Sequence, residues 1–433
     1  MRVRVSVKES SMVRPIAETP RRSLWLSNLD LVMPTTHHTH TVYFYRSNGA
    51  ATFFDVAVLK DALARVLVDF YPYAGRLQKA DDGRIQINCN AEGVLFVETD
   101  CDTHLDDLGG FSPRPDLALV PNVDYSHGIS SFPILLIQLT RFQCGSVCLG
   151  VLSEHHIADG FSALHFINTW SDIARGYTAS SAAVLPFLDR RLLSARVPPQ
   201  PQFPHPEYQP PPPLITPLPN TNKSHNIFTL TPDFLKSLKQ KCNRQNESVY
   251  TTFEAVTGHV WRCVCEARGL PGEQETKLQI SVDGRARLQP PLPPGFLGNG
   301  VFFTTWTATY GELVSNPVEV AAEKVHEALV RMDDEYLRSA LDYLELHLPN
   351  NKDIARSERS VKCPNFGIAT WVRLPFYEAD FGWGKPVYAG PGRPQFEGKA
   401  LLFADAKNDG SMLLAITLLE PHMDAFRNLL YHI

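Results

Sequence analysis

A proline-rich stretch near the middle of the chain is the feature that most restricts how this sequence can fold. Half of the positions from Pro198 to Pro219 are proline, including the run Pro210 to Pro213. Proline fixes φ and lacks an amide donor, so the stretch cannot continue a helix or a sheet and favours extended polyproline II. We therefore expect a linker over residues 191–225 that joins an N-terminal domain (1–190) to a C-terminal domain (226–433).

Length and composition agree with two globular domains. The chain has 433 residues, of which 44% are hydrophobic and 20% are charged, so the apolar content suffices for a core. The net charge of -5 lacks the basic excess that phosphate neutralisation needs, which argues against a nucleic-acid partner. No apolar run reaches the length of about 18 residues that a membrane span requires, and the first residues lack the apolar part of a signal peptide. We expect no membrane span and a cytoplasmic location.

Apolar periodicity predicts interleaved helices and strands in both halves. The helical pattern covers residues 55–70, 161–175, 232–242 and 318–346, the last as one long helix or a broken pair. Thr231 is a candidate N-cap, and Thr251 with Glu254 has the spacing of a capping box at the start of another helix. The strand pattern covers residues 134–141, 147–153, 277–282 and 412–418. This alternation indicates the α/β class.

The sharpest polar cluster runs from His155 to Gly160, where a predicted strand ends and a helix begins. A histidine has an unperturbed pKa of about 6.5, so His155 could act as a general base near neutral pH. Asp159 could orient that imidazole, as in a catalytic triad, or it could turn away and pin the loop through an arginine, with Gly160 relaxing the backbone. The alternative is a polar turn that contains a structurally satisfied histidine.

Other motifs are weaker. The sequence has no G-x-S-x-G elbow for a serine nucleophile and no G-x-x-x-x-G-K-[ST] phosphate loop. Asp380-Phe381-Gly382 matches the kinase triplet, but no catalytic-loop H-R-D precedes it. The histidines at positions 37, 38 and 40 lack a carboxylate partner at suitable spacing, so we expect no metal site.

Two arginines could bind an anion. Arg373 lies in the otherwise apolar stretch 371–375, where its charge needs either a buried acidic residue or the carboxylate of a substrate. Arg285, in the turn 283–287, could form a structural ion pair or could face a ligand.

Two motifs taken together point to a family. The pattern H-x-x-x-D-G at 155–160 precedes D-F-G-W-G at 380–384, and long segments at 7–32, 71–77, 159–176, 283–295 and 371–375 fit the same assignment. The sequence resembles the plant BAHD acyl-CoA-dependent acyltransferases. Within that family it is most similar to the hydroxycinnamoyl-CoA:shikimate/quinate hydroxycinnamoyltransferases.

The resemblance implies a two-domain α/β fold like that of chloramphenicol acetyltransferase, with mixed sheets, helices and a solvent channel between the domains. It implies a monomer in which His155 deprotonates the acceptor hydroxyl as that hydroxyl attacks the thioester, without a covalent intermediate. No cofactor is needed, because the CoA thioester is a substrate. The implied donors are p-coumaroyl-CoA and caffeoyl-CoA, and the implied acceptors are shikimate and quinate.

The resemblance also assigns roles to individual residues. Residues that support the site are Asp159, paired with Arg285, together with Gly160, Asp380 and Trp383. Residues that bind the acceptor are Arg373, as a carboxylate clamp, together with Thr39, Thr41, Tyr43, Trp371 and His165. Other acceptors stay open, namely a phenolic hydroxy acid, as in rosmarinic-acid-type synthesis, or a polyamine. A non-catalytic binding protein with the same fold is a further alternative.

Overall fold

The computed structural model describes residues 3–34, 37–109, 111, 117–177, 184–243, 250–348 and 354–433. Its internal contacts divide the chain into two compact units. Unit 1 comprises Met1–Ser194, Leu292–Gly300 and Leu374–Arg393, and unit 2 comprises Ala195–Pro291, Val301–Arg373 and Pro394–Ile433. The units are thus not the two continuous halves expected from the proline-rich stretch, because two later segments return to unit 1.

The main sheet of unit 1 explains one of these returns. It has six strands in the order β1-β6-β7-β8-β3-β13, and only the pair β6–β7 among these neighbours is parallel. The strands are β1 (Val5–Val13), β3 (His38–Tyr45), β6 (Val94–Cys101), β7 (Leu135–Phe142), β8 (Val147–Glu154) and β13 (Tyr388–Pro391). Because β13 pairs with β3, the D-F-G-W-G motif just before β13 belongs to unit 1 and not to a C-terminal domain.

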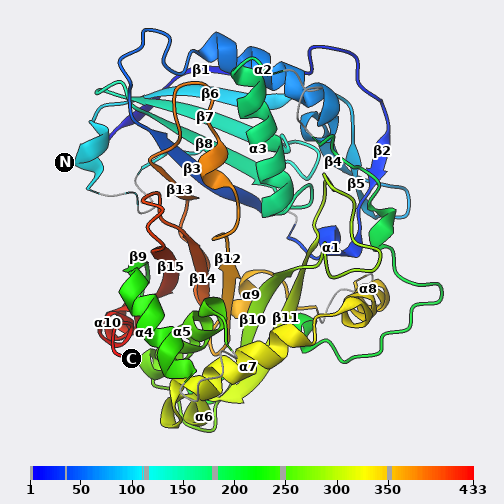
Figure 1. Ribbon diagram of the computed structural model, residues 1–433. Helices are drawn as coiled ribbons and strands as arrows, with labels where there is room; N and C mark the ends of the chain where they lie inside the picture. The colour runs from blue at the N-terminus through cyan, green and yellow to red at the C-terminus, as the bar shows by residue number, and fades with distance from the viewer. Residues whose placement is uncertain are drawn as a thin grey trace. The chain divides into compact units, whose positions relative to one another are not determined.

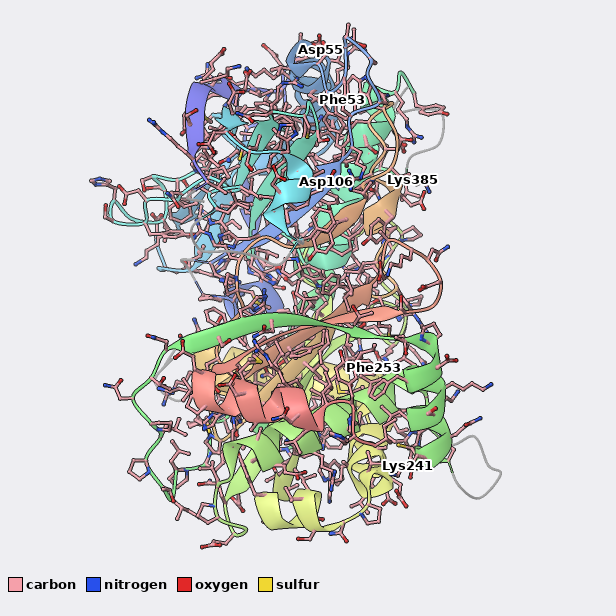
Figure 2. All side chains as sticks on the ribbon, turned by 90° about the vertical axis from the view of Figure 1, so that its left-hand side faces the viewer. Phe53, Asp55, Asp106, Lys241, Phe253 and Lys385 are labelled. Atoms are coloured by element: carbon pink, nitrogen blue, oxygen red, sulfur yellow. The ribbon has the colours of Figure 1, made fainter. Side chains whose placement is uncertain are left out.

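Two helices pack together beside this sheet (Figure 1). They are α2 (Val56–Asp69) and α3 (Gly160–Ala174), and the indole N–H of Trp170 on α3 donates to the Leu59 carbonyl on α2 at 3.0 Å. Asp55 caps α2 by accepting the backbone N–H groups of residues 57 and 58, and Figure 2 shows it beside Phe53.

The smaller elements of unit 1 are a three-stranded sheet of β2 (Ser23–Trp25), β5 (Ile85–Asn88) and β4 (Arg76–Lys79), the helix α1 (Asn28–Leu31), and short 3-10 helices over Tyr71–Ala74, Leu105–Leu108, Arg190–Leu193 and Phe376–Glu378.

Unit 2 contains a second mixed sheet of six strands in the order β11-β10-β12-β14-β15-β9. The strands are β9 (Lys223–Leu230), β10 (Glu275–Asp283), β11 (Val301–Thr309), β12 (Phe366–Thr370), β14 (Lys399–Ala404) and β15 (Met412–Leu419). Strand β12 is parallel to both of its neighbours, and the other pairs are antiparallel.

Two helices of unit 2 begin at the caps that the sequence predicts. Thr231 caps α4, and Thr251 forms a capping box with Glu254 at the start of α5. The pattern over 318–346 is a broken pair, because Asp333 caps a new helix. The helices are α4 (Pro232–Cys242), α5 (Thr252–Arg268), α6 (Tyr310–Ser315), α7 (Val318–Val330), α8 (Asp334–His347), α9 (Glu358–Val361), α10 (Glu420–Leu429) and a 3-10 turn over Pro206–Tyr208. Among the described helices, none combines the length and the apolar character that crossing a bilayer requires.

The proline-rich stretch is more than a solvated linker. His205 and Glu207 within it are buried and bonded to each other at 2.8 Å, and the second ring nitrogen of His205 lies 2.8 Å from the Ser339 hydroxyl on α8. The stretch is therefore anchored onto α8 as part of unit 2.

Candidate active site

The cluster from His155 to Gly160 occupies the connection between β8 and α3. Strand β8 ends at Glu154 and helix α3 begins at Gly160, so His155 is the first residue beyond a central, fully buried strand. A position at the end of a rigid strand fixes a side chain more closely than an open loop does.

The backbone of His155 is held on both sides. Its N–H donates to the His37 carbonyl at 3.1 Å, which extends the β3–β8 ladder, and its carbonyl accepts the Asn299 side-chain amide at 2.8 Å. The imidazole is half-buried, and its enclosed Nδ1 has no hydrogen-bond partner within the described part of the chain.

His37 lies against His155. The two rings stack with their centroids 5.9 Å apart. Burial, reinforced by the nearby His155, lowers the pKa of His37 to about 3. His37 is thus uncharged at neutral pH and places no positive charge beside the base.

The carboxylate of Asp159 accepts hydrogen bonds from two backbone N–H groups. Its Oδ1 accepts the Ser162 N–H at 3.1 Å, which caps α3, and its Oδ2 accepts the Gly300 N–H at 2.9 Å. These contacts differ from those of a triad acid, which would bond the imidazole. Gly160 is the first residue of α3 and does not adopt a left-handed conformation, so the glycine is not required there by backbone strain.

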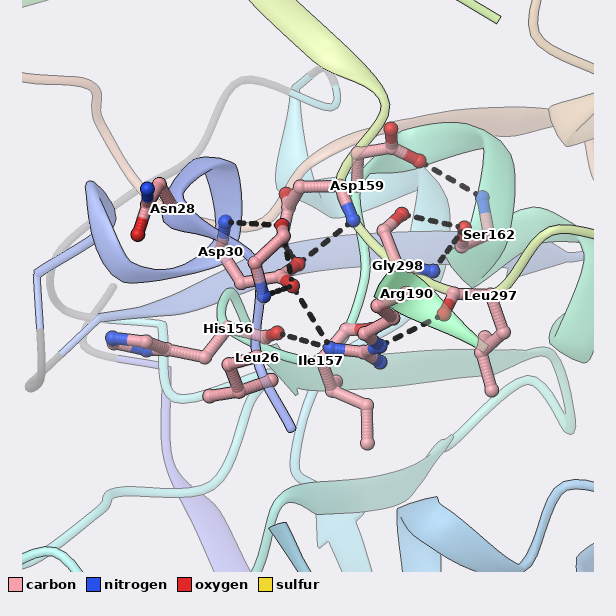
Figure 3. Close-up of polar contacts among 12 residues, drawn as sticks. Leu26, Asn28, Asp30, His156, Ile157, Asp159, Ser162, Arg190, Leu297 and Gly298 are labelled. Carbon is pink, nitrogen blue, oxygen red and sulfur yellow. Dashed lines mark hydrogen bonds and ion pairs between the residues drawn. The ribbon is translucent and has the colours of Figure 1, made fainter. Parts of the chain in front are cut away.

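Arg190 binds the backbone of the segment from His155 to Gly160, and the sequence analysis did not identify it. Its side chain is almost fully buried and donates to the carbonyls of His156 at 3.0 Å, Ile157 at 2.7 Å and Leu297 at 3.1 Å (Figure 3). Its sequence context is three consecutive charged residues, 189–191, between apolar pairs, and nothing in that run singles out Arg190 as the buried one.

Asp30 compensates the charge of Arg190. The two side chains lie 3.3 Å apart, and both are buried. Asp30 Oδ1 also accepts the backbone N–H of Asn299 at 2.9 Å and its side-chain amide at 2.8 Å. Because the same amide donates to the His155 carbonyl, this buried pair is linked to the backbone of the predicted base.

A second buried acid, Glu154, lies directly before His155 and was also missed. Its Oε1 lies 2.7 Å from Nδ1 of the His156 ring, and its Oε2 accepts the His156 backbone N–H at 2.7 Å. Both side chains are inaccessible to solvent. In the β3–β8 register Glu154 faces His38, whose ring lies 2.8 Å from the Tyr125 hydroxyl.

Strand alternation places Glu154 and His38 on the opposite face of the β3–β8 pair from the hydroxyl residues that were predicted to bind the acceptor. Thr39 pairs with Ser153, Thr41 pairs with Val151 and Tyr43 pairs with Leu149, so the three predicted residues share one face of β3. Thr41 Oγ1 donates to the Val151 carbonyl at 3.4 Å, Tyr43 is fully buried, and burial raises the pKa of its phenol. The same alternation puts His37 on the opposite face from His38 and His40.

His165 lies on α3 and is half-buried. Its Nε2 lies 2.7 Å from the Val184 carbonyl, and its ring meets Phe70 edge-on at 5.0 Å. Burial lowers its pKa. One ring nitrogen is thus occupied by a backbone carbonyl.

The D-F-G-W-G motif folds onto itself within unit 1. Asp380 Oδ1 accepts the N–H groups of Gly382 at 2.8 Å and Gly384 at 3.0 Å, and both glycines have positive φ. The Trp383 ring stacks obliquely on Phe54 at 5.0 Å. Asp380 thus stabilises the turn of the motif, and Trp383 packs against a neighbouring aromatic ring.

Three predicted site residues lie in unit 2. Arg285 forms an ion pair with Asp283 at 3.1 Å, which matches the structural alternative for that turn. Trp371 follows β12 and donates its backbone N–H to the Leu402 carbonyl at 2.7 Å. Arg373 is exposed, so its charge does not need a buried acidic partner. The pairing of Asp159 with Arg285 stays a prediction.

No cluster of three or more histidine, cysteine, aspartate or glutamate side chains among the described residues could hold a metal ion.

Comparison with known proteins assigns the chain. The model of the Transferase family matches residues 3–433. This chain belongs to the BAHD acyltransferases. It is 53% identical to a rosmarinate synthase of Plectranthus scutellarioides, with 100% of each chain covered, and 52% identical to a shikimate O-hydroxycinnamoyltransferase of Nicotiana tabacum, with 99% and 100% covered.

A solved BAHD structure shows the same fold. The crystal structure of vinorine synthase matches with a TM-score of 0.74 at 22% identity, and it covers 98% of this chain and 96% of the other. The α/β class with mixed sheets, expected from the sequence, is thereby confirmed. The relatives that match along the whole chain are hydroxycinnamoyltransferases with different acceptors. The comparison therefore assigns this chain to the acyltransferases and does not identify its acceptor.

Proposed function

We propose that this chain transfers a hydroxycinnamoyl group, p-coumaroyl or caffeoyl, from coenzyme A to a hydroxyl of shikimate, with quinate as the alternative acceptor. The observation that carries the proposal is the imidazole of His155, which is half-buried just beyond the end of β8 with its Nδ1 enclosed, and the proposal assigns the proton transfer to Nε2. Membership of the BAHD acyltransferases supplies the thioester donor.

One base suffices for the reaction. Nε2 of His155 takes the proton of the acceptor hydroxyl as the oxygen attacks the thioester carbonyl. The tetrahedral intermediate collapses, the C–S bond breaks, and the proton passes from His155 to the leaving thiolate. The products are the ester and free CoA, and the base is regenerated. Because the thioester is already activated, no acyl-enzyme and no cofactor is required.

Shikimate and quinate are carboxylates with several hydroxyl groups. The exposed guanidinium of Arg373 is suited to a charge-assisted pair with the acceptor carboxylate. The hydroxyl side chains of Thr39 and Thr41 share one face of β3, which suits a polyol, whereas Tyr43 on the same face is fully buried. An arginine in this role argues against a polyamine acceptor, because like charges repel.

The second candidate is transfer to a phenolic hydroxy acid, and it is favoured by the 53% identity to rosmarinate synthase. That acceptor also carries a carboxylate, so Arg373 fits both candidates. The choice depends on whether the acceptor pocket favours a polyol or an aromatic ring.

A panel of acceptors tests the proposal. Purified protein is incubated with p-coumaroyl-CoA and shikimate, quinate, a phenolic hydroxy acid or a polyamine, and released thiol is measured. The proposal predicts the highest kcat/KM with shikimate or quinate. A higher kcat/KM with the phenolic hydroxy acid selects the second candidate, and no release with any acceptor contradicts both. We also propose a cytoplasmic monomer that binds no nucleic acid.

A further inference from the structure

We propose that Glu154 is a positioning residue for His155, and that it acts by clamping the backbone of His156 immediately after the base. The inference rests on the proposed function, in which His155 removes the acceptor proton. It assigns a role to a residue that neither the H-x-x-x-D-G motif nor the D-F-G-W-G motif contains.

The clamp has two contacts to a single neighbouring residue. Oε2 of Glu154 accepts the backbone N–H of His156 at 2.7 Å, and Oε1 lies at 2.7 Å from the ring Nδ1 of the same residue. Hydrogen bonds to a carboxylate are shorter and stronger than neutral ones. Nε2 of His156 has no hydrogen-bond partner among the described residues, so the polar contact of this ring is made through Nδ1.

Glu154 makes one of three hydrogen bonds that hold the two backbone polar groups of His155 and the N–H of His156, beside the bonds of Arg190 to the two carbonyls that follow. The His155 N–H is bound to the His37 carbonyl, the His155 carbonyl is bound to the Asn299 amide, and the next N–H, of His156, is bound to Glu154. The imidazole Nδ1 itself lacks a partner in the described part of the chain. The direction of the ring therefore depends on its backbone, and Glu154 supplies one of the three restraints.

The cost of this arrangement argues against a merely structural turn. A carboxylate with no solvent exposure loses its hydration, and a neutral side chain could cap the same N–H at less cost. The groups that face Glu154 are the ring of His156 and, across the strand pair, His38 with its partner Tyr125. Burial lowers the pKa of His38 despite the opposing effect of Glu154. Among the described residues, the Glu154 carboxylate makes its direct polar contacts with His156, through the backbone N–H and the ring Nδ1, each at 2.7 Å.

Unit 2 contains a matched control. Glu207 and His205 form a second buried carboxylate–imidazole pair at 2.8 Å, with two residues of separation and no solvent exposure of either side chain. Replacing Glu207 by Gln makes the same chemical change in a buried pair of the other unit.

The test compares four variants with the wild type: Glu154→Gln, Glu207→Gln, His156→Ala and His156→Asn. CoA release is followed with p-coumaroyl-CoA and the best acceptor of the panel, and the melting temperature of each variant is recorded. We expect Glu154→Gln to lower kcat on the order of tenfold to a hundredfold, with both KM values nearly unchanged, because misplacement of a catalytic group acts on the chemical step. Glu207→Gln should lower the melting temperature and leave kcat unchanged.

The variants of His156 give a second readout if Glu154→Gln fails to fold. His156→Ala removes the ring contact and should lower kcat in the same way. Asn places an amide N–H near the position of Nδ1, so His156→Asn should recover most of the lost rate.

The outcomes separate the two proposals. If the wild type is active and Glu154→Gln keeps the wild-type kcat, the positioning role alone is overturned. The same holds if Glu207→Gln loses as much kcat as Glu154→Gln. Equal kcat in His156→Ala and His156→Asn overturns it as well. A wild type that releases no CoA with any acceptor contradicts the proposed function and the positioning role together.

Discussion

The rings of His37 and His155 stack with their centroids 5.9 Å apart, at the adjoining ends of β3 and β8. The His155 N–H donates to the His37 carbonyl at 3.1 Å, so one residue supports both the backbone and the ring of the other. Because burial lowers the pKa of His37 to about 3, this support depends on pH.

The stability of unit 1 should fall as the pH falls below about 6.5, the ordinary pKa of histidine. The unfolded chain then binds a proton at residue 37 that the folded chain binds only near pH 3, so unfolding takes up a proton and acid favours it. Between pH 6.5 and pH 5 this contributes about 1–2 kcal/mol. His37→Asn should flatten the dependence of the unfolding midpoint on pH. A slope in His37→Asn equal to that of the wild type would contradict the assignment.

Arg373→Ala should raise the KM for shikimate about fivefold, because an exposed charge pair that is screened by water contributes on the order of 1 kcal/mol. The KM for p-coumaroyl-CoA and the melting temperature should not change. Arg359→Ala, at another exposed arginine of unit 2, is the control. An unchanged KM for shikimate in Arg373→Ala would rule out the carboxylate clamp.

Asp159→Ala should destabilise unit 1 by about 2–4 kcal/mol, since it removes the cap of α3 and leaves the Gly300 N–H without its acceptor. Asp159→Asn keeps one acceptor oxygen and should lose less. Chemical denaturation measures both. If Asp159→Ala loses activity at unchanged stability, Asp159 acts in the chemistry and not in the fold.

Arg190→Met should be strongly destabilising, by about 3–5 kcal/mol, because Asp30 is left as an uncompensated buried charge. The double variant Arg190→Met with Asp30→Asn should recover part of this loss, since the second change removes that charge. The coupling free energy of the four-variant cycle is the quantity to measure. Strictly additive losses would show that the ion pair does not hold the loop.

Local signals in the sequence predicted much of the fold. Asp55, Thr231 and the Thr251–Glu254 pair mark helix starts that the structure confirms, because caps depend on a few neighbouring residues. The position of His155 between a strand and a helix followed from the same kind of signal.

Contacts between distant parts of the chain could not be predicted in this way. The pairing of β13 with β3 and the bond from Gly300 to Asp159 join segments more than a hundred residues apart. Arg190 and Glu154 were missed for the same reason, since their partners Asp30 and His156 are set by the folded backbone and the charge alone does not identify them. The exposed position of Arg373 likewise depends on how its turn packs, and the apolar neighbours suggested burial instead.

The central claim is that His155 removes the acceptor proton, and its most direct test is CoA release by the wild type and by His155→Ala with p-coumaroyl-CoA and shikimate. A general base contributes a factor of about 10²–10⁴, so the variant should lose at least about a hundredfold in kcat at an unchanged melting temperature. A folded His155→Ala variant that releases CoA at the wild-type rate would contradict the account.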